Sequence, residues 1–385
     1  MTAVFLAHTA APSGAELATL RLVSALPAGT AAVVYTEDGP MPHHMRERGI
    51  ETRSVTTDFD SRALTIDKAD TRALLTGALG LIRLGWRLGD TMRELGATVV
   101  VAGSTKALLM GAVAARRARV PLVWHVHDRV SADYFGRWLA PALRILGWLV
   151  AHGVIANSRG TLASLYTWRR LAVVAYPGVE FRHDHAEPNR EEQRDPAETV
   201  VAVVGRLAPW KGQDVFLRAL AAVRVLPREV FLIGGTFFDE EHYRTELENL
   251  ATALDLPVTF TGHVDDPEPY LRCADVLVHC SVLPEPFGQV VVEGMRAGCA
   301  VIASRPGGPE EIIETGRDGL LVPGGDRHQL TRALDTLLGD RELRVKLAAA
   351  ARLRAHDFDI DESARTVERF LTMVTVRRRK WWRRG

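Results

Sequence analysis

The sequence of 385 residues is poor in cysteine, nearly neutral in net charge and without a long hydrophobic run. Cys273, Cys280 and Cys299 lack the spacing of a metal site or a disulfide framework, so they are expected to be buried, small hydrophobic residues in a reducing cytoplasm. The formal net charge of +1 argues against a nucleic-acid partner. No window reaches the roughly 18 uninterrupted apolar residues of a membrane span, and the first residues lack the pattern of a signal peptide.

Positive charge gathers at the C-terminus. The segment Arg377–Arg384 reads RRRKWWRR and carries six positive charges, so that residues 1–376 sum to −5. We expect this basic, Trp-containing tail to be a solvated, frayed terminus. Because tryptophan favours membrane interfaces and arginine favours anionic headgroups, peripheral contact with the inner face of an anionic membrane is the alternative.

Short apolar runs alternate with segments of helical period along most of the chain. Near-continuous apolar runs are typical of parallel strands buried on both faces, and their alternation with helices predicts βαβ units. The expected strands are Val4–His8, Ala31–Thr36, Thr98–Ala102, Leu122–Val126, Val154–Asn157, Val173–Ala175, Val200–Val204, Val230–Ile233, Val258–Thr261, Val276–His279, Ala300–Ala303 and Leu320–Val322. The expected helices include Glu16–Leu26, Thr71–Leu95, Ala132–Val150, Asp214–Val225, Glu240–Leu254, Phe287–Ala297 and Gln329–Leu338.

This pattern predicts an α/β protein of two doubly wound, Rossmann-like domains that face each other across a cleft. Open parallel sheets bind ligands beyond the carboxyl ends of their strands, so the loops there should carry the chemistry. The polar, charged composition near residues 180–199 predicts an exposed connection. We expect a first domain at 1–180, a linker at 181–199, a second domain at 200–360, a helix at 361–376 that crosses back to the first domain, and the tail at 377–385.

Two loops of the first half carry candidate residues. Gly14, in TAAPSGAE, precedes a helix whose unpaired amides favour an anion, although glycine is also common in a plain βα turn. His127 and Asp128 follow the expected strand Leu122–Val126, at the end that should face the cleft. An imidazole there would hydrogen-bond a substrate hydroxyl or shuttle a proton; the alternative is a structural histidine.

The second half has a basic loop after its first strand. In GRLAPWKGQD, Gly205 lets the chain turn, and Arg206 and Lys211 place two cations beside a helix N-terminus. Arginine offers a planar fork to phosphate oxygens and lysine a compact charge. The loop therefore suits a diphosphate better than it suits a solvated basic turn.

Two acids follow in the segment PEPFGQVVVEGMRAG. Glu285 precedes Pro286-Phe287-Gly288, and Glu293 lies eight residues later, on the helix expected to begin at about Gln289. Carboxylates beside the amide end of a helix suit the hydroxyl groups of a sugar and a ribose. A metal site is the poorer interpretation, because no Asp or His of suitable spacing joins them.

Together these segments resemble the signature of the retaining glycosyltransferases of family 4 (glycosyl transferases group 1), which have the GT-B fold. GRLAPWKG and EPFGQVVVEGMRAG carry most of the resemblance. NSR at 157–159, PGVE at 177–180, TGHV at 261–264 and RPGGPEEII at 305–313 follow in family order. One departure is that Ser13-Gly14 stands where the family usually has two glycines.

The resemblance implies a site for a nucleotide-diphosphate sugar, with UDP favoured, which is a substrate and not a cofactor. Arg206 and Lys211 would bind the diphosphate and replace the charge of a divalent metal, so no metal or other cofactor is expected. Glu285 would bind the donor sugar, Glu293 the ribose, and His127 the sugar near the reaction centre. The other implied donor-binding residues are Gly14 and Gly205 at the diphosphate, Phe287, Gly288 and Gln289 at the sugar, and Gly235, His263 and Val264 near the nucleobase.

The acceptor implied is a hydroxyl of a glycan, a lipid-linked glycan or a secondary metabolite, bound mainly by the first domain. The segments Thr71–Leu95 and Tyr134–Val150, rich in Leu, Trp and Arg, are interpreted as core helices or, alternatively, as an amphipathic surface that meets a lipid-linked acceptor. The resemblance also implies front-face attack by the acceptor, since no nucleophile is evident opposite the leaving group. A non-catalytic nucleotide-sugar-binding subunit, or another GT-B enzyme such as a sugar epimerase, remains the alternative function.

Overall fold

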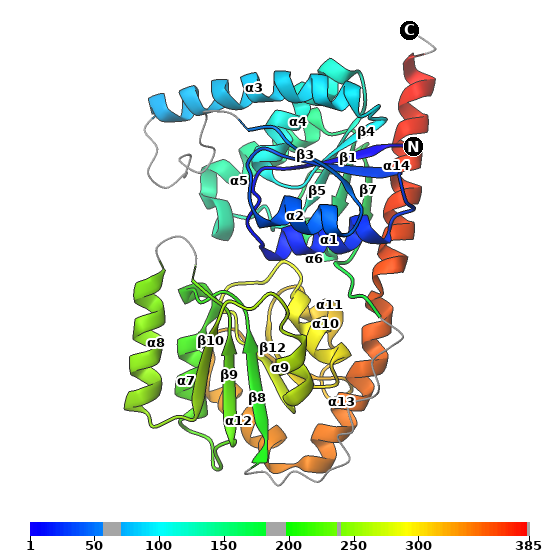
Figure 1. The fold of residues 1–385 in the computed structure, drawn as a ribbon. Helices are drawn as coiled ribbons and strands as arrows, with labels where there is room; N and C mark the ends of the chain where they lie inside the picture. Colours follow the sequence, from blue (N-terminus) through cyan, green and yellow to red (C-terminus); the bar gives the residue numbers. More distant parts are fainter. Residues whose placement is uncertain (57–70, 182–197, 237–239, 383–385) are drawn as a thin grey trace. The chain divides into compact units, whose positions relative to one another are not determined.

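The computed structural model describes residues 1–56, 71–181, 198–236 and 240–382, and it divides into two compact units (Figure 1). Unit 1 comprises residues 1–180 and 360–385, and unit 2 comprises residues 181–359. Each contains a parallel sheet with helices on both faces, which confirms the α/β, Rossmann-like class expected from the sequence. Most of the expected linker (residues 182–197) and the last three residues of the tail lie outside the described residues.

The sheet of unit 1 has seven strands in the order β3-β2-β1-β4-β5-β6-β7, all parallel. Alternate residues of each central strand point to opposite faces, and both faces are buried, which is why the strands read as unbroken apolar runs. The strands are β1 (Ala3–Ala7), β2 (Ala31–Tyr35), β3 (Glu51–Ser54), β4 (Val99–Ala102), β5 (Leu122–Val126), β6 (Gly153–Ala156) and β7 (Leu171–Val174).

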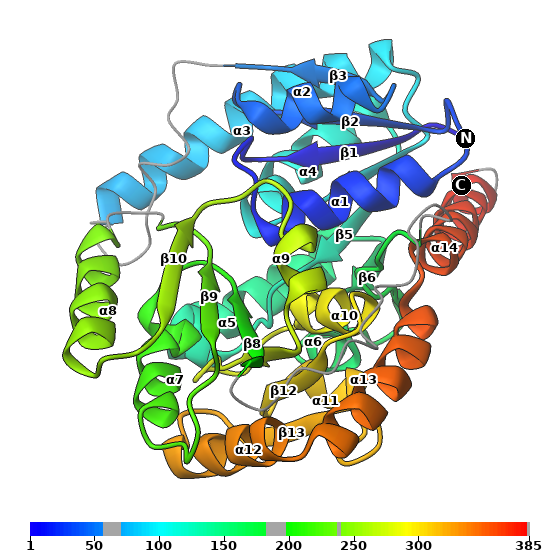
Figure 2. The same cartoon turned by 60° about the horizontal axis from the view of Figure 1, so that its bottom comes forward.

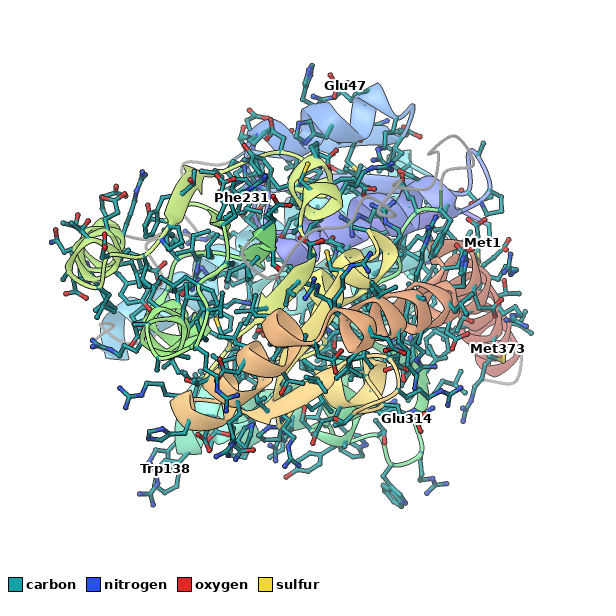
Figure 3. All side chains as sticks on the ribbon, turned by 90° about the horizontal axis from the view of Figure 1, so that it is seen from below. Met1, Glu47, Trp138, Phe231, Glu314 and Met373 are labelled. Atoms are coloured by element: carbon teal, nitrogen blue, oxygen red, sulfur yellow. The ribbon has the colours of Figure 1, made fainter. Side chains whose placement is uncertain are left out.

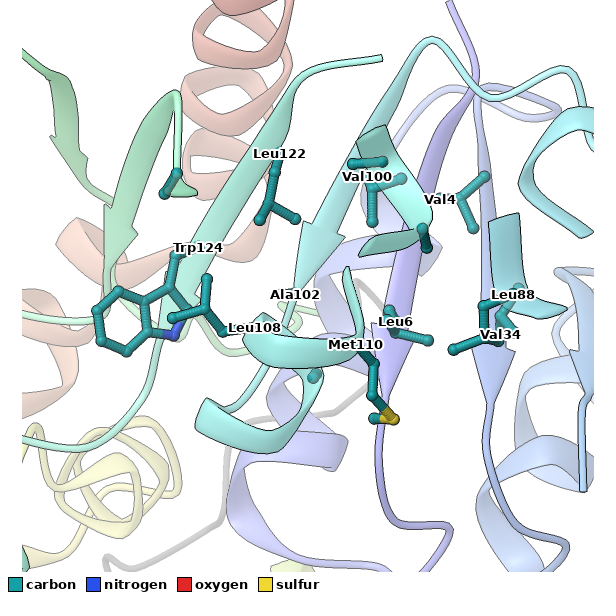
Figure 4. Packing of buried hydrophobic residues seen from close by; sticks show 14 of the residues in the cluster. Val4, Leu6, Val34, Leu88, Val100, Ala102, Leu108, Met110, Leu122 and Trp124 are labelled. Atoms are coloured by element: carbon teal, nitrogen blue, oxygen red, sulfur yellow. The ribbon is translucent and has the colours of Figure 1, made fainter. Parts of the chain in front are cut away.

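Two hydrophobic layers cover this sheet. One contains α3 (Thr71–Glu94), α4 (Thr105–Ala118) and α5 (Ala132–Val150), and Figure 4 shows Leu88, Leu108 and Met110 from these helices packed with residues of the strands. The opposite layer contains α1 (Gly14–Ala25), α2 (Pro40–Glu47) and α14 (Ile360–Trp382). The short α6 (Arg159–Ala163) lies between β6 and β7 in the chain.

The sheet of unit 2 has six parallel strands in the order β10-β9-β8-β11-β12-β13 (Figure 2). One face packs against α7 (Gln213–Leu220), α8 (Glu241–Ala253) and α12 (Arg327–Gly339). On the other face α10 (Gln289–Arg296) lies on β11 and β12, and α9 (Glu268–Cys273) lies near β8; α11 (Pro309–Ile312) and α13 (Arg341–Ala355) complete the unit. The strands are β8 (Val200–Val204), β9 (Glu229–Ile233), β10 (Val258–Gly262), β11 (Val276–His279), β12 (Ala300–Arg305) and β13 (Leu320–Pro323).

Several features differ from the sequence-based expectation. The helix expected at Asp214–Val225 ends at Leu220 as α7, and Cys273, expected to be buried, is exposed. The strand β3 reads ETRS and has no apolar run, because it lies at the edge of the sheet and is only partly buried. The helix α14 runs through Trp382, whereas we expected a helix that stops at residue 376 and a frayed tail. The sequence RRRKWW contains no glycine or proline, so nothing in it ends the helix.

The helix α14 belongs to unit 1 because its apolar face fills the layer beside α1. Phe370 and Val374 are buried there and lie against Gly153 at the start of β6. Ser363 donates a hydrogen bond from its hydroxyl to the carbonyl of Tyr176, at 2.7 Å. The final helix is therefore part of the core of unit 1.

We expect Phe370→Ala to lower the free energy of unfolding of unit 1 by about 3–5 kcal/mol, because it removes a buried ring and leaves a cavity. Urea unfolding followed by circular dichroism measures this loss. The matched control is Met373→Ala on the same helix, whose side chain is 53% exposed and should cost little. Equal losses for the two variants would contradict the packing described here.

Candidate functional site

The candidate site of unit 2 is built from loops at the carboxyl ends of β8, β11 and β12. The loop after β8 is held against the loop after β11: the amide of Val282 donates to the carbonyl of Trp210 at 2.9 Å, and the thiol of Cys280 donates to the carbonyl of Lys211. Gly212 makes this approach possible. It has φ 71°, and a Cβ at this position would lie 2.2 Å from the carbonyl oxygen of Cys280.

This approach joins Lys211 to Glu285. The ammonium Nζ donates to both carboxylate oxygens, at 3.0 and 2.9 Å, and the two side chains are only 17% and 15% exposed. The same ammonium lies 4.3 Å from the centre of the Trp210 ring, a cation–π distance. The structure thus brings together two residues that the sequence singled out from segments 74 positions apart.

Two residues that the sequence analysis missed also hold Glu285. Ser281 donates its hydroxyl to Oε2 of Glu285 at 2.9 Å, and Nε2 of the buried His279 lies 3.4 Å from the same oxygen. The amide of Ser304 on β12 donates to Nδ1 of His279, which assigns the ring proton to Nε2, directed toward the carboxylate. The signal was weak, because HCS at the end of a buried strand also suits an ordinary core.

The charge of Glu285 is fixed by these neighbours. Burial alone would raise the pKa of its carboxyl, but the ammonium of Lys211 and the hydrogen bond from His279 lower that pKa well below its ordinary value. At neutral pH the site therefore holds a carboxylate and an ammonium in direct contact. Both charges are positioned before any ligand arrives.

Arg206 has a different acidic neighbour. Its Nε lies 3.3 Å from a carboxylate oxygen of Glu240, and its guanidinium lies 5.9 Å from the centre of the Trp210 ring. The carbonyl of Arg206 accepts a hydrogen bond from the side chain of Gln213 at 2.8 Å, which fixes the backbone of this loop. The two cations expected at a diphosphate thus flank Trp210, each beside its own carboxylate.

The N-terminus of α10 forms the next part of the site. Gly288, with φ 94°, precedes the helix, and Phe287 is buried with its ring 5.8 Å from that of Phe358. Glu293 is buried on the helix, where its carboxylate accepts a hydrogen bond from the side chain of Gln289 at 3.3 Å. The amide of Gly308 donates to the carbonyl of Glu285 at 2.8 Å, so the loop that leads into α10 is held from the β12 side as well.

The three residues expected near a nucleobase lie at the ends of β9 and β10. Gly235 is in close contact with His263, since a Cβ on that glycine would lie 3.1 Å from the Cβ of His263. His263 is 46% exposed, and its Nε2 lies 3.6 Å from a carboxylate oxygen of Asp265. Val264 follows and is half-buried. The structure brings Gly235 and His263 together.

In unit 1, Gly14 is the first residue of α1, at the carboxyl end of β1. Its backbone is ordinary, and a Cβ at this position would meet no atom within 4 Å. The hydroxyl of Ser13 donates to the carboxylate of Glu16 one turn into the helix. Burial raises the pKa of Glu16, the hydrogen bond from Ser13 opposes this, and the charges of Asp128 and Glu37 raise it further. The space beside Gly14 is therefore open, and the nearby carboxyl of Glu16 is shifted toward its neutral form.

His127 follows β5 and lies close to a second histidine, with the two rings tilted relative to each other. The ring centres of His125 and His127 are 4.1 Å apart, and His125 is buried within the strand. Burial lowers the pKa of His127 to about 4. Burial, with a smaller contribution from His127, lowers the pKa of His125 well below its ordinary value. Both imidazoles are uncharged at neutral pH, so His127 is suited to hydrogen bonding and not to carrying a positive charge. Asp128, next to it, is exposed.

The two units have the architecture of GT-B glycosyltransferases, and comparisons with known proteins agree. Residues 12–183 match the family described as glycosyltransferase family 4, and residues 185–354 match glycosyl transferases group 1. The HepE protein of Anabaena, crystallised with UDP-glucose, is 27% identical, with a TM-score of 0.81 over 97% of this chain and 100% of that chain.

Curated relatives show the same family. A D-inositol 3-phosphate glycosyltransferase of Streptomyces scabiei is 30% identical over 306 residues, which cover 72% of this chain and 68% of the relative. A lipopolysaccharide core biosynthesis glycosyltransferase of Rhizobium meliloti is 34% identical over 163 residues, 42% of this chain and 46% of the relative. In several such matches the chain spans only about half the length of the relative. The chain belongs to the family 4, group 1 glycosyltransferases of GT-B fold.

We expect Lys211→Met to lower the free energy of unfolding by about 3 kcal/mol at pH 7, because it leaves the carboxylate of Glu285 partly buried without its cation. The pKa of Glu285 is depressed in the folded protein, so the stability that the pair contributes is present above pH about 4.5 and is lost as the pH falls. The difference between variant and wild type should therefore shrink as the pH falls below about 4.5. Urea unfolding at several pH values measures it, with the exposed Lys346→Met as the control.

We expect Gly14→Ala to leave the fold unchanged, because the added methyl group meets open space and a helical backbone. If a diphosphate approaches this glycine, the methyl group should raise the KM for the nucleotide sugar about tenfold or more. Gly339→Ala, at the last residue of α12 with equally open space, is the matched control. An unchanged KM in a correctly folded Gly14→Ala variant would remove Gly14 from the donor site.

Proposed function

We propose that this protein transfers a sugar from a nucleotide-diphosphate sugar, with UDP favoured, to a hydroxyl group of an acceptor, with retention of anomeric configuration. The observation that carries this proposal is the pair of Lys211 and Glu285, held between loops at the carboxyl ends of the strands of unit 2. It is supported by the 27% identity over 97% of the chain to HepE, which was crystallised with UDP-glucose.

The donor is proposed to lie along the carboxyl ends of the strands of unit 2. Lys211 and Arg206 bind the diphosphate, Glu285 accepts hydrogen bonds from hydroxyls of the sugar, and Glu293 does the same for the ribose. The partly buried ion pair supports this proposal, because the ammonium of Lys211 can contact a phosphate oxygen while it still orients Glu285. The remaining proposed donor contacts are the backbone amides of Phe287, Gly288 and Gln289, the loop at Gly205, the nucleobase contacts at Gly235, His263 and Val264, and, from unit 1, Gly14 and His127.

The proposed reaction breaks the bond between the anomeric carbon and the diphosphate oxygen and forms one to the acceptor oxygen. The acceptor attacks on the face that the diphosphate leaves, and its hydroxyl proton passes to the departing phosphate. Negative charge grows on the leaving oxygen, so Lys211, Arg206 and the N-terminus of α10 stabilise the transition state more than the ground state. Each such preorganised donor is worth about 2.7–4 kcal/mol in comparable sites. Because two cations supply this charge, we propose that transfer needs no divalent metal and persists in a chelator.

The proposed acceptor is a molecule with a free hydroxyl group. It is a glycan, a lipid-linked glycan or a small secondary metabolite. None of the helices within the described ranges combines the length and apolarity that a bilayer crossing requires. We propose a cytoplasmic protein, in keeping with its three free thiols, whose basic tail contacts the inner face of the membrane peripherally.

We expect a panel of UDP-, GDP-, ADP- and TDP-sugars to raise the Tm of the full chain most with a UDP-sugar, because a ligand that binds only the folded state stabilises it. The Lys211→Ala variant should show no such shift in Tm. Its rate of UDP release in the presence of acceptor should fall by at least about a hundredfold. Lys346→Ala, which removes an exposed lysine of α13, is the matched control. Product anomers assigned by nuclear magnetic resonance test retention.

The outcomes separate the alternatives. A Tm shift with a UDP-sugar but no turnover with any acceptor pool would favour a non-catalytic nucleotide-sugar-binding subunit. Turnover that converts the donor sugar without an acceptor product would favour a sugar epimerase. Normal transfer by a folded Lys211→Ala variant would refute the assignment of the donor site.

A further inference from the structure

The helix α5 carries apolar side chains on its outer face as well as on its inner face. Leu143 and Gly147 are buried toward the sheet, as expected for a helix of an α/β layer. Trp138, Ile145 and Leu149 are nevertheless 77%, 49% and 58% exposed. Their spacing of seven and four residues places them along one side of the helix, after the kink at Gly136. Figure 3 shows Trp138 extending away from the ribbon.

The exposed apolar side of α5 continues onto the segment that leads into β7. Tyr166 and Trp168 are 47% and 69% exposed. The indole nitrogen of Trp148, on α5, donates to the carbonyl of Trp168 at 3.0 Å, which ties this segment to the helix. The segment that carries Tyr166 and Trp168 therefore lies beside the C-terminal part of α5.

Arginines line the same area. The acidic Asp133 lies in the first turn of α5, before the kink at Gly136. The guanidiniums of Arg137, Arg169 and Arg170 lie 4.9, 5.3 and 5.4 Å from the ring centres of Trp138, Trp168 and Trp148, respectively. From residue 134 to residue 179 the sequence contains five arginines and no aspartate or glutamate. We call Trp138, Ile145, Leu149, Tyr166 and Trp168, with Arg137, Arg169 and Arg170, the aromatic–arginine surface.

We propose that the aromatic–arginine surface binds an anionic lipid bilayer, with α5 lying in the plane of the interface. Exposed tryptophan and leucine beside arginine are the combination that holds an amphipathic helix at headgroup level, where indole rings meet apolar chains and guanidinium groups meet phosphates. Each arginine near an anionic membrane adds about fivefold to the binding constant.

The charge of the surface disfavours a second copy of this chain as its occupant. In a two-fold dimer the same patch occupies both sides of the interface, so arginines would face arginines. An anionic bilayer instead complements the arginines of the surface. The start of the basic tail supports the same occupant, because Arg378 and Arg170 both act on His152, whose pKa is lowered to about 4 by burial and by these two charges. Arg378 thus lies on the same side of unit 1 as Arg170.

Co-sedimentation of the full chain with vesicles tests this proposal. We expect binding to equal mixtures of phosphatidylcholine and phosphatidylglycerol and about a tenfold or greater loss with phosphatidylcholine alone. The double variants Trp138→Ala/Trp168→Ala and Arg169→Glu/Arg170→Glu should each weaken binding about tenfold or more, while circular dichroism and Tm stay unchanged. The matched controls on unit 2 are Leu353→Ala, 75% exposed, and Arg332→Glu/Lys346→Glu, which should bind as the wild type does.

Several results would overturn the proposal. One is wild-type binding that does not depend on phosphatidylglycerol. A second is loss of binding on deletion of residues 377–385 with no effect of either surface variant, which would assign the lipid contact to the tail alone. A third is a dimer in light scattering that dissociates in Trp138→Ala/Trp168→Ala without vesicle binding. Release of UDP from a soluble donor, measured without vesicles, reports separately on the proposed transfer reaction.

Discussion

The contact between Lys211 and Glu285 is the interaction on which the candidate site depends. Two opposite charges with little exposure are stable only if each satisfies the other and the remaining oxygens have donors. Gly212 and Gly308 allow the flanking loops to approach closely enough to supply that geometry, and Ser281 and His279 complete the donors around the carboxylate. These contacts consequently hold the loops after β8, β11 and β12, and the charged side chains on them, in fixed positions relative to one another.

The two units differ in the kind of polar group that they present at the carboxyl ends of their strands. Unit 2 presents groups whose charge is locked, since Glu285 is held as an anion beside the ammonium of Lys211. Unit 1 presents groups that burial shifts toward neutrality, namely His127 and Glu16. The fixed ammonium of Lys211 suits the diphosphate of a donor and the fixed carboxylate of Glu285 suits sugar hydroxyls, whereas the neutral groups of unit 1 suit hydroxyls alone. The chemistry of each unit therefore agrees with the part of the reaction proposed for it.

The sequence predicted the two sheets well because strands buried on both faces leave unbroken apolar runs. It failed at β3, whose edge position permits polar residues, and at the end of α14, where charge suggested a frayed tail but helix propensity was intact. Lys211 and Glu285 were recognisable because charged residues interrupt small and apolar ones. His279 was not, because its role depends on Ser304, 25 residues away, which comes close only when β11 pairs with β12.

The hydrophobic periodicity of α5 could not predict that its outer face is exposed. A helix with apolar residues on nearly every side reads as a core helix, and the inner half of α5 is indeed core. Burial is decided by which neighbours the sheet provides, and the sheet of unit 1 covers one side of this helix only. On the other side, Trp138, Ile145 and Leu149 remain in contact with water. Exposing these apolar side chains costs free energy, and such exposed patches are typical of binding surfaces. Because arginines accompany them, the partner that covers these side chains should be apolar, extended and negatively charged at its surface.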